Sequence, residues 1–253
     1  MSTMTVSSGL YKSYSHISSG KRINSAADDA AGLAIGKKME REERGLLVGA
    51  ENTKDGIGML NVADGALDGI MDHLQRIREL GLRSMNGLNS DSDREAYQTE
   101  IDQLKEGIQS IAKNTSFNER ALLDGSMADL HLATNPSGGG LDIGMEDATL
   151  QALGIADLDV TSADFNLDAI DKAMKMVSEQ RSGLGASTNR LEYTYNYNLS
   201  AHEEQLGARS RIEDLDMPKA ISEQKKEELL SQYRNLMLRK KMDQKANVLR
   251  LFQ

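Results

Sequence analysis

The chain has 253 residues, a formal net charge of -9, and neither cysteine nor tryptophan. The negative charge argues against general nucleic-acid binding, and the lack of cysteine excludes disulfides, thiolate nucleophiles and cysteine metal sites. No N-terminal apolar run resembles a cleaved signal peptide, and no stretch is long and apolar enough to predict insertion in a membrane. If the protein is exported, we expect a route that needs no cleaved signal.

Residues 18–39 read SSGKRINSAADDAAGLAIGKKM, which begins like a turn and continues like a helix dominated by alanine and glycine. Small residues allow backbones to approach closely, so we expect tight packing around this segment. Its polar residues are Arg22, Asp28 and Asp29. Their side chains either make specific contacts or face water at a helix start, where carboxylates are favoured.

Two helices are predicted next, over 39–86 and 92–113. In the first, Leu60, Leu67 and Leu74 recur every seven residues, each followed three residues later by another apolar residue. This is the a/d pattern of a coiled-coil helix. The second follows the sequence SDSD, a typical N-cap region, and has a heptad pattern of its own.

The segment 114–165 is rich in turn residues, and we expect a small β element there. Leu130 and Leu132 precede the sequence NPSGGG, and Leu141 and Ile143 follow it, in each case with period-two spacing. Alternating apolar residues on both sides of a glycine-rich turn predict a β-hairpin.

A third long helix is predicted over 166–212, because apolar residues again repeat every seven positions from Ile170 to Leu191. An amphipathic segment follows Pro218. The chain thus has the order long helix, helix, small β element, long helix, and its amphipathic ends find few partners within the chain. Self-assembly through these ends, an adaptor and a pore-forming helical protein all fit this pattern.

The 18–39 segment resembles the N-terminal signature of bacterial flagellins, roughly L-S-S-G-x-R-I-N-x-A-x-D-D-A-A-G-x-A-I. Similarity continues at 52–87, 114–126, 166–198, 210–220 and the ending VLRLFQ. The resemblance implies a mainly α protein, an elongated antiparallel helical bundle or coiled-coil rod over 37–212 with a small β-hairpin region. Residues 1–36 are then the N-terminal inner-tube helix and spoke, and 213–253 the C-terminal inner-tube helix, the two terminal helices forming an inner coiled-coil domain.

The same resemblance implies function and partners. Flagellins are exported unfolded by the flagellar type III apparatus and polymerise into the extracellular filament used for motility, without a cofactor. The expected partners are other copies of the chain, the flagellar cap, the hook-junction proteins and an export chaperone that binds the C-terminal segment. The residues expected to contact neighbouring subunits are Arg22, Ile23, Asn24, Asp28, Asp29, Leu249 and Leu251.

Flagellins sensed by Toll-like receptor 5 carry a Q-R-x-R-E-L motif and a glutamate on the following helix. This sequence has these residues as Gln75, Arg76, Glu79, Leu80 and Glu100. The resemblance implies that Arg76 is a forked donor, Leu80 an apolar anchor and Glu100 an acceptor on the adjacent helix. In the family this surface also serves axial contacts between subunits, so only a free subunit would bind the receptor.

No enzyme is predicted. The four histidines are scattered, and His202 begins a sequence like that of a zinc peptidase but lacks the second histidine. The C-terminal segment is more basic than in most flagellins, which indicates either a solvated face or an altered tube wall. Two alternatives to a filament subunit stay open: a hook–filament junction protein, and a secreted flagellin paralogue that polymerises poorly.

Overall fold

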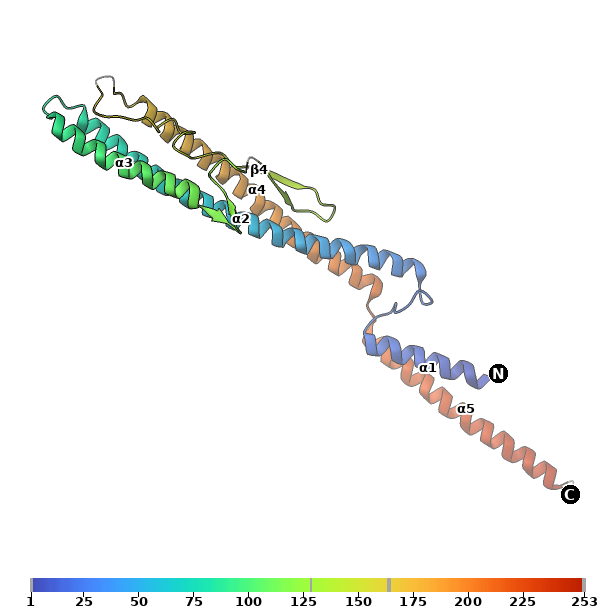
Figure 1. The fold of residues 1–253 in the computed structure, drawn as a ribbon. Helices are drawn as coiled ribbons and strands as arrows, with labels where there is room; N and C mark the ends of the chain where they lie inside the picture. Colours follow the sequence, from blue (N-terminus) through green and yellow to red (C-terminus); the bar gives the residue numbers. More distant parts are fainter. Residues whose placement is uncertain (1, 128, 163–164, 252–253) are drawn as a thin grey trace. The chain divides into compact units, whose positions relative to one another are not determined.

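A computed structural model describes residues 2–127, 129–162 and 165–251 (Figure 1). Side chains are described for 11–127, 129–162 and 165–245. By contacts the chain divides into two compact units. Unit 1 comprises Met1–Glu43 with Glu203–Gln253, and unit 2 comprises Arg44–His202. The rod limits expected from the sequence, residues 37 and 212, stay a prediction.

The helices in the described ranges are α1 (Ser2–Ser19), α2 (Ala30–Ser84), α3 (Asp91–Asn114), α4 (Asp168–Glu213) and α5 (Met217–Leu251). The strands are β1 (Ser116–Phe117), β2 (Arg120–Ala121), β3 (Asp129–Ala133) and β4 (Gly140–Gly144). The mainly α fold with a small β region is therefore confirmed. The first long helix begins at Ala30 rather than at residue 39, because Asp29 caps it there, as described below.

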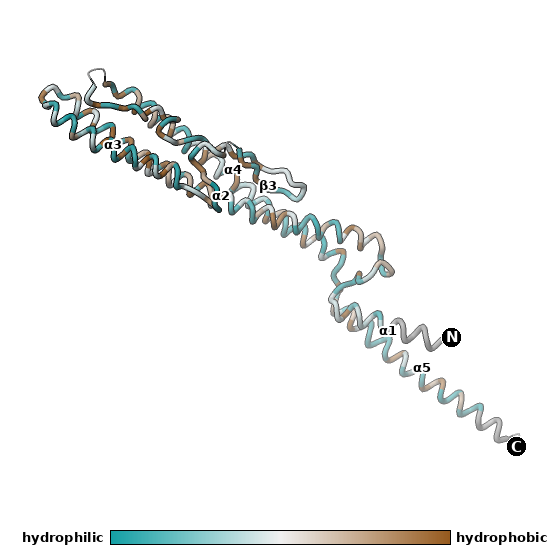
Figure 2. Tube along the Cα trace, viewed as in Figure 1, coloured by the Kyte–Doolittle hydropathy of each residue, from teal (hydrophilic) through white to brown (hydrophobic). Residues whose placement is uncertain are grey.

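Unit 2 is built on the heptads of α2, α3 and α4, which pack side by side (Figure 1). Leu60, Leu67 and Leu74 of α2 are no more than 1% exposed, and Ile108 of α3 and Val177 of α4 are fully buried with them. Hydrophobic and hydrophilic positions alternate along these helices (Figure 2). Each large apolar side chain buried in this way contributes about 1.5–3 kcal/mol to stability.

The start of α3 is fixed by its own sequence. Ser90 is the N-cap: its side chain accepts a hydrogen bond from the Asp93 backbone, and the Asp93 carboxylate accepts one from the Ser90 backbone. This capping box satisfies two backbone donors that the first turn leaves free. The Ser90 hydroxyl also donates to Asp93, which lowers the pKa of that carboxyl. The expected N-cap region is thus confirmed.

The predicted hairpin is confirmed with its register. Strands β3 and β4 are antiparallel, and Leu130 lies opposite Ile143 and Leu132 opposite Leu141. Asn198 of α4 donates a 2.7 Å hydrogen bond to the Thr134 carbonyl at the hairpin loop. A second, shorter hairpin, β1–β2, was not predicted separately; its turn residues Asn118 and Glu119 have φ of 48° and 66°.

In unit 1, α1 packs antiparallel against α5. Lys21, just after α1, forms a backbone bridge with Asp214, just before α5. Further from this bridge, the Ser13 hydroxyl of α1 donates to the Glu227 carboxylate of α5. Past this point α5 carries an exposed apolar stripe. Its members are Leu229, Leu230, Tyr233, Leu236 and Met237, which are 44–65% exposed.

Candidate functional site

The signature segment forms a tight turn between α1 and α2. Gly20 ends α1 with a φ of +68°, a left-handed conformation that glycine adopts without strain. The turn is then tied to the link between α4 and α5. The Arg22 amide donates to the Glu213 carbonyl at 2.6 Å, and the Leu215 amide donates to the Gly20 carbonyl at 2.9 Å.

Asp28 holds this turn together. Its Oδ2 accepts hydrogen bonds from the amides of Asn24 and Ser25, each at 3.0 Å. Its Oδ1 lies 2.7 Å from the Lys12 ammonium of α1. The hydrogen bond from Lys12, followed by those from the backbone, holds the pKa of Asp28 far below its usual range. The carboxylate therefore stays ionised and joins α1 to the turn.

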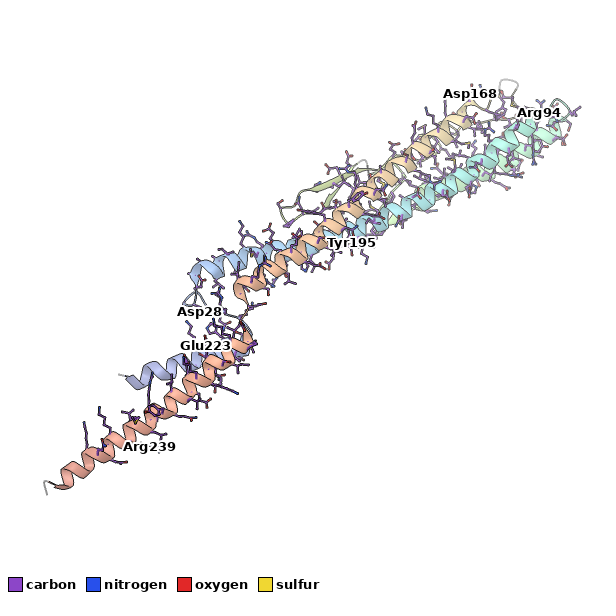
Figure 3. All side chains as sticks on the ribbon, turned by 180° about the vertical axis from the view of Figure 1, so that it is seen from behind. Asp28, Arg94, Asp168, Tyr195, Glu223 and Arg239 are labelled. Carbon is purple, nitrogen blue, oxygen red and sulfur yellow. The ribbon has the colours of Figure 1, made fainter. Side chains whose placement is uncertain are left out.

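Asp29 is the N-cap of α2. Its Oδ1 accepts a 2.8 Å hydrogen bond from the Gly32 amide, and its carbonyl accepts one from the Leu33 amide. Both aspartates of the signature thus bind groups of their own chain rather than simply facing water at a helix start. Asp28 is labelled beside the turn in Figure 3.

The close packing expected here occurs at two glycines. A Cβ on Gly32 would lie 2.6 Å from Cδ1 of Ile23, and one on Gly36 would overlap the Glu213 carboxylate. Ile23 is 2% exposed, and Glu213, also buried, receives Lys21 Nζ at 3.1 Å. The alanines at 26, 27, 30, 31 and 34 are exposed.

The residues expected at subunit contacts therefore fall into two groups. Arg22, Asn24, Asp28 and Asp29 lie together in the turn, where Arg22 Nη2 also donates to the Ile212 carbonyl at 2.6 Å, and Ile23 is buried beneath them. Leu249 and Leu251 belong to α5, but their side chains lie outside those that the structure describes.

Two residues that complete this turn, Lys12 and Glu213, were not predicted from the sequence. Glu213 lies in the sequence SRIEDLDMPKA, which does not indicate its contacts, because its partner Lys21 is 192 residues away in the chain. Only its place before a proline-containing helix start marked the region as a turn.

The second candidate site lies on α2 and α3 of unit 2. Arg76 Nε and Nη2 both donate to Oε1 of Glu100, at 2.9 and 2.7 Å, and Nη1 donates to Glu79 at 3.3 Å. The bond to Glu100 raises the pKa of the Arg76 guanidinium. Nearby, Arg78 donates to Asp171 of α4 at 2.7 Å. The motif residues Arg76, Glu79 and Glu100 are thus brought together, with Gln75 exposed beside them.

One expected residue of this site is not available at the surface. Leu80 is 1% exposed and belongs to the core of unit 2, so its side chain does not present an apolar anchor. The reason is helical geometry: Leu80 follows the buried Ile77 by three residues, which places it beside Ile77 on the buried face of α2. The accessible part of the site is the charged cluster.

The described side chains contain no group of three or more His, Asp or Glu that would hold a metal ion. None of the helices in the described ranges combines the length and the apolar character needed to cross a bilayer. The two sites offer hydrogen bonds and ion pairs, those of Asp28 and of Arg76, which suit contact with another macromolecule.

Comparison with known proteins agrees with this architecture. Residues 2–128 match the bacterial flagellin N-terminal helical region and residues 167–252 the C-terminal helical region. The chain is 42% identical to a flagellin of Halalkalibacterium halodurans over 95% of this chain and 90% of that protein. It is 40% identical to a flagellin of Bacillus subtilis, over 95% of this chain and 91% of that protein.

Other relatives extend the comparison. A flagellar filament core protein of Brachyspira hyodysenteriae is 35% identical over 96% of this chain and 92% of that protein. Among solved structures, Bacillus cereus flagellin superposes with a TM-score of 0.53 at 27% identity, covering 58% of this chain and 88% of that one. A protein described as hook-associated, from Vibrio parahaemolyticus, gives 0.62 at 18% identity over 74% of this chain and all of that one, which shows the fold alone.

These relatives are named as flagellins and filament proteins rather than enzymes, in agreement with two sites that offer surfaces for contact. The matched regions and the identities of 40% and 42% to named flagellins favour a flagellin over a junction protein. The chain therefore belongs to the bacterial flagellin family, the structural subunits of the extracellular flagellar filament.

Proposed function

We propose that this flagellin is exported unfolded by the flagellar type III apparatus and polymerises into a filament that drives motility. The observation that supports polymerisation most directly is the exposed apolar stripe of α5 from Leu229 to Met237. A monomeric protein rarely leaves such a row of apolar side chains in water, because burying them is favourable. Copies of the chain packed through their terminal helices would bury it.

The signature turn is the second proposed subunit contact. It holds Arg22, Asn24 and Asp28 in a fixed arrangement before any neighbour is present, so little conformational entropy is lost when a neighbour binds. The exposed alanines beside it leave room for another backbone. In this proposal the flagellar cap and the hook-junction proteins contact the two ends of the filament. An export chaperone binds the apolar stripe of α5 before export.

Seeded polymerisation tests this role. Purified chain mixed with short preformed filaments should yield long tubes by electron microscopy. A strain that lacks its flagellin should swim again when it expresses this chain. A secreted paralogue that polymerises poorly would fail both assays, and a junction protein would bind filament ends without lengthening them.

We also propose that the free subunit is a ligand of Toll-like receptor 5 through Arg76, Glu79 and Glu100, with Gln75 beside them. The guanidinium of Arg76 has five N–H donors, of which two are used on Glu100 and one on Glu79, so donors stay available for a partner. Arginine is also a frequent hot-spot residue. Leu80 is not part of the contact, because it is buried.

Arg76→Lys is the matched test, since lysine keeps the positive charge but lacks the fork. Affinity for the purified receptor ectodomain should fall by about tenfold or more. Arg44→Lys, on the same helix outside the cluster, should bind like the unmodified chain. Equal affinity of Arg76→Lys and the unmodified chain would rule out this site.

A further inference from the structure

The loop between α2 and α3 contains the one Asn-Gly pair of the sequence, Asn86–Gly87. Both residues are exposed, and they follow the end of α2 at Ser84. The side-chain carbonyl carbon of an asparagine, Cγ, is an electrophile, and the amide nitrogen of the next residue is a nucleophile close to it. When these two atoms react, the asparagine loses ammonia and becomes an acid without the help of an enzyme.

The loop folds the Asn86 side chain over the backbone that follows it. Asn86 Oδ1 accepts a 3.2 Å hydrogen bond from the Leu88 amide, which closes an Asx turn around Gly87. The turn holds Cγ on the side of the Gly87 nitrogen. The Leu88 N–H also donates to the oxygen on which negative charge develops during the attack, and a donor fixed in that position lowers the barrier.

The Gly87 nitrogen is accessible as a nucleophile. Its N–H makes no hydrogen bond within the part of the chain that the structure describes. A Cβ added at Gly87 would meet no atom within 4 Å, so neighbouring segments do not enclose this residue. Because glycine has no side chain, nothing of its own blocks the approach of the nitrogen to Cγ.

Two other Asx turns show what distinguishes Asn86. The Oδ1 atoms of Asn135 and Asn166 each accept a 3.1 Å hydrogen bond from the amide two residues further on. Both asparagines are exposed, as Asn86 is. Asn135 is followed by Pro136, whose nitrogen has no hydrogen to lose. Asn166 is followed by Leu167, whose side chain crowds the nitrogen. Among these three turns, the unhindered nucleophile is therefore present at Asn86 alone.

We propose that Asn86 is a self-modification site, at which the chain converts this asparagine to aspartate and isoaspartate. The Gly87 nitrogen gives its proton to hydroxide and attacks Cγ. The new C–N bond closes a five-membered succinimide ring, the Cγ–Nδ2 bond breaks, and ammonia leaves with a proton from water. Water then opens the ring at Cγ to give aspartate, or at the backbone carbonyl carbon to give isoaspartate. One water is consumed for each ammonia released, and the inference does not depend on filament formation.

Either product changes the end of α2. Aspartate places a negative charge beside the C-terminus of the helix, where it is unfavourable. Isoaspartate adds a methylene group to the main chain, which disturbs two 3.1 Å hydrogen bonds, from the Asn86 amide to the Arg83 carbonyl and from the Asn89 amide to the Asn86 carbonyl. We therefore expect the loop to open more often, and the modified fraction to rise with the age of the chain.

Peptide mass spectrometry of the purified chain tests the site. During incubation in mildly alkaline buffer, Asn86 should gain about 1 Da, with fragment ions distinguishing it from Asn89, and an isoaspartyl methyltransferase should label the same peptide. Asn135 and Asn166 are internal controls, and they should convert more slowly by about tenfold or more. Conversion of Asn166 as fast as that of Asn86 would overturn the role given to Gly87.

Gly87→Ala is the matched variant, because its Cβ meets no neighbour and should leave circular dichroism and melting unchanged. Conversion of Asn86 should slow by about tenfold or more. Gly58→Ala, which also adds a Cβ in open space on α2, should convert at the rate of the unmodified chain. Equal rates in Gly87→Ala and the unmodified chain would overturn the proposal. So would an Asn86 that converts only after the chain is unfolded in urea.

Discussion

Two glycines of α2 should respond in opposite ways to the same substitution. In a helix interior, glycine to alanine gains about 1 kcal/mol of helix propensity. At Gly58 nothing lies within 4 Å of the added Cβ, so this gain should appear in full. At Gly49 the Cβ would overlap the Thr134 carbonyl oxygen and lie 2.8 Å from its carbon. Backbone atoms of the hairpin cannot turn aside as a side chain can.

We therefore expect Gly49→Ala to lose about 1–3 kcal/mol net, because the hairpin must shift and its bond from Asn198 is disturbed. For a chain of this size, 1 kcal/mol moves the melting temperature by about 2–4 °C. Thermal unfolding followed by circular dichroism should show Gly58→Ala melting above the unmodified chain and Gly49→Ala below it. If both melt higher, the hairpin does not pack on α2 as tightly as described.

Other substitutions probe the turn and the hairpin. Asp29→Ala should destabilise the start of α2 by about 1 kcal/mol, because the Gly32 amide loses its acceptor; amide hydrogen exchange at 30–36 would report it, and unchanged exchange would contradict the cap. His131 lies 2.6 Å from Asp142, and this hydrogen bond raises its pKa above its ordinary 6.5. The stabilisation should be complete below about pH 6.5 and be lost as pH rises through the folded-state pKa. His131→Asn should remove this pH dependence of the melting temperature.

The sequence predicted most of unit 2 because its core is periodic. Leu60, Leu67 and Leu74 recur every seven residues and so identify the buried face of α2. The alternation of apolar residues on both sides of NPSGGG predicts both the β3–β4 hairpin and its register. The β1–β2 hairpin is too short to have a period, so only the left-handed residues Asn118 and Glu119 reveal it.

The receptor motif shows the limit of resemblance. A motif names residues but not the side of the helix on which they lie. For Leu80 the sequence does contain a signal. Leu80 follows Ile77 by three residues, a spacing that places both side chains on the same, buried face of α2. The contacts of Glu213 could not be predicted from the sequence, because its partner Lys21 lies 192 residues away in the chain and the pair follows no repeat.

The exposed alanines of the signature are the last feature that bears on subunit contact. Ala30, Ala31 and Ala34 lie on the outer face of α2, where a single subunit would accept larger side chains without strain. Alanine is favoured in α2 by its high helix propensity alone, and its small size also lets another surface come close, as in the proposed subunit contact. Ala31→Leu should therefore melt like the unmodified chain, because exposed substitutions usually change stability by less than about 0.5 kcal/mol. Filaments of Ala31→Leu should nonetheless grow more slowly from seeds. Lys38→Leu on the same helix is the control, because it adds an apolar side chain without replacing a small one by a large one. Growth of Ala31→Leu at the rate of the unmodified chain would mean that no neighbour approaches this face.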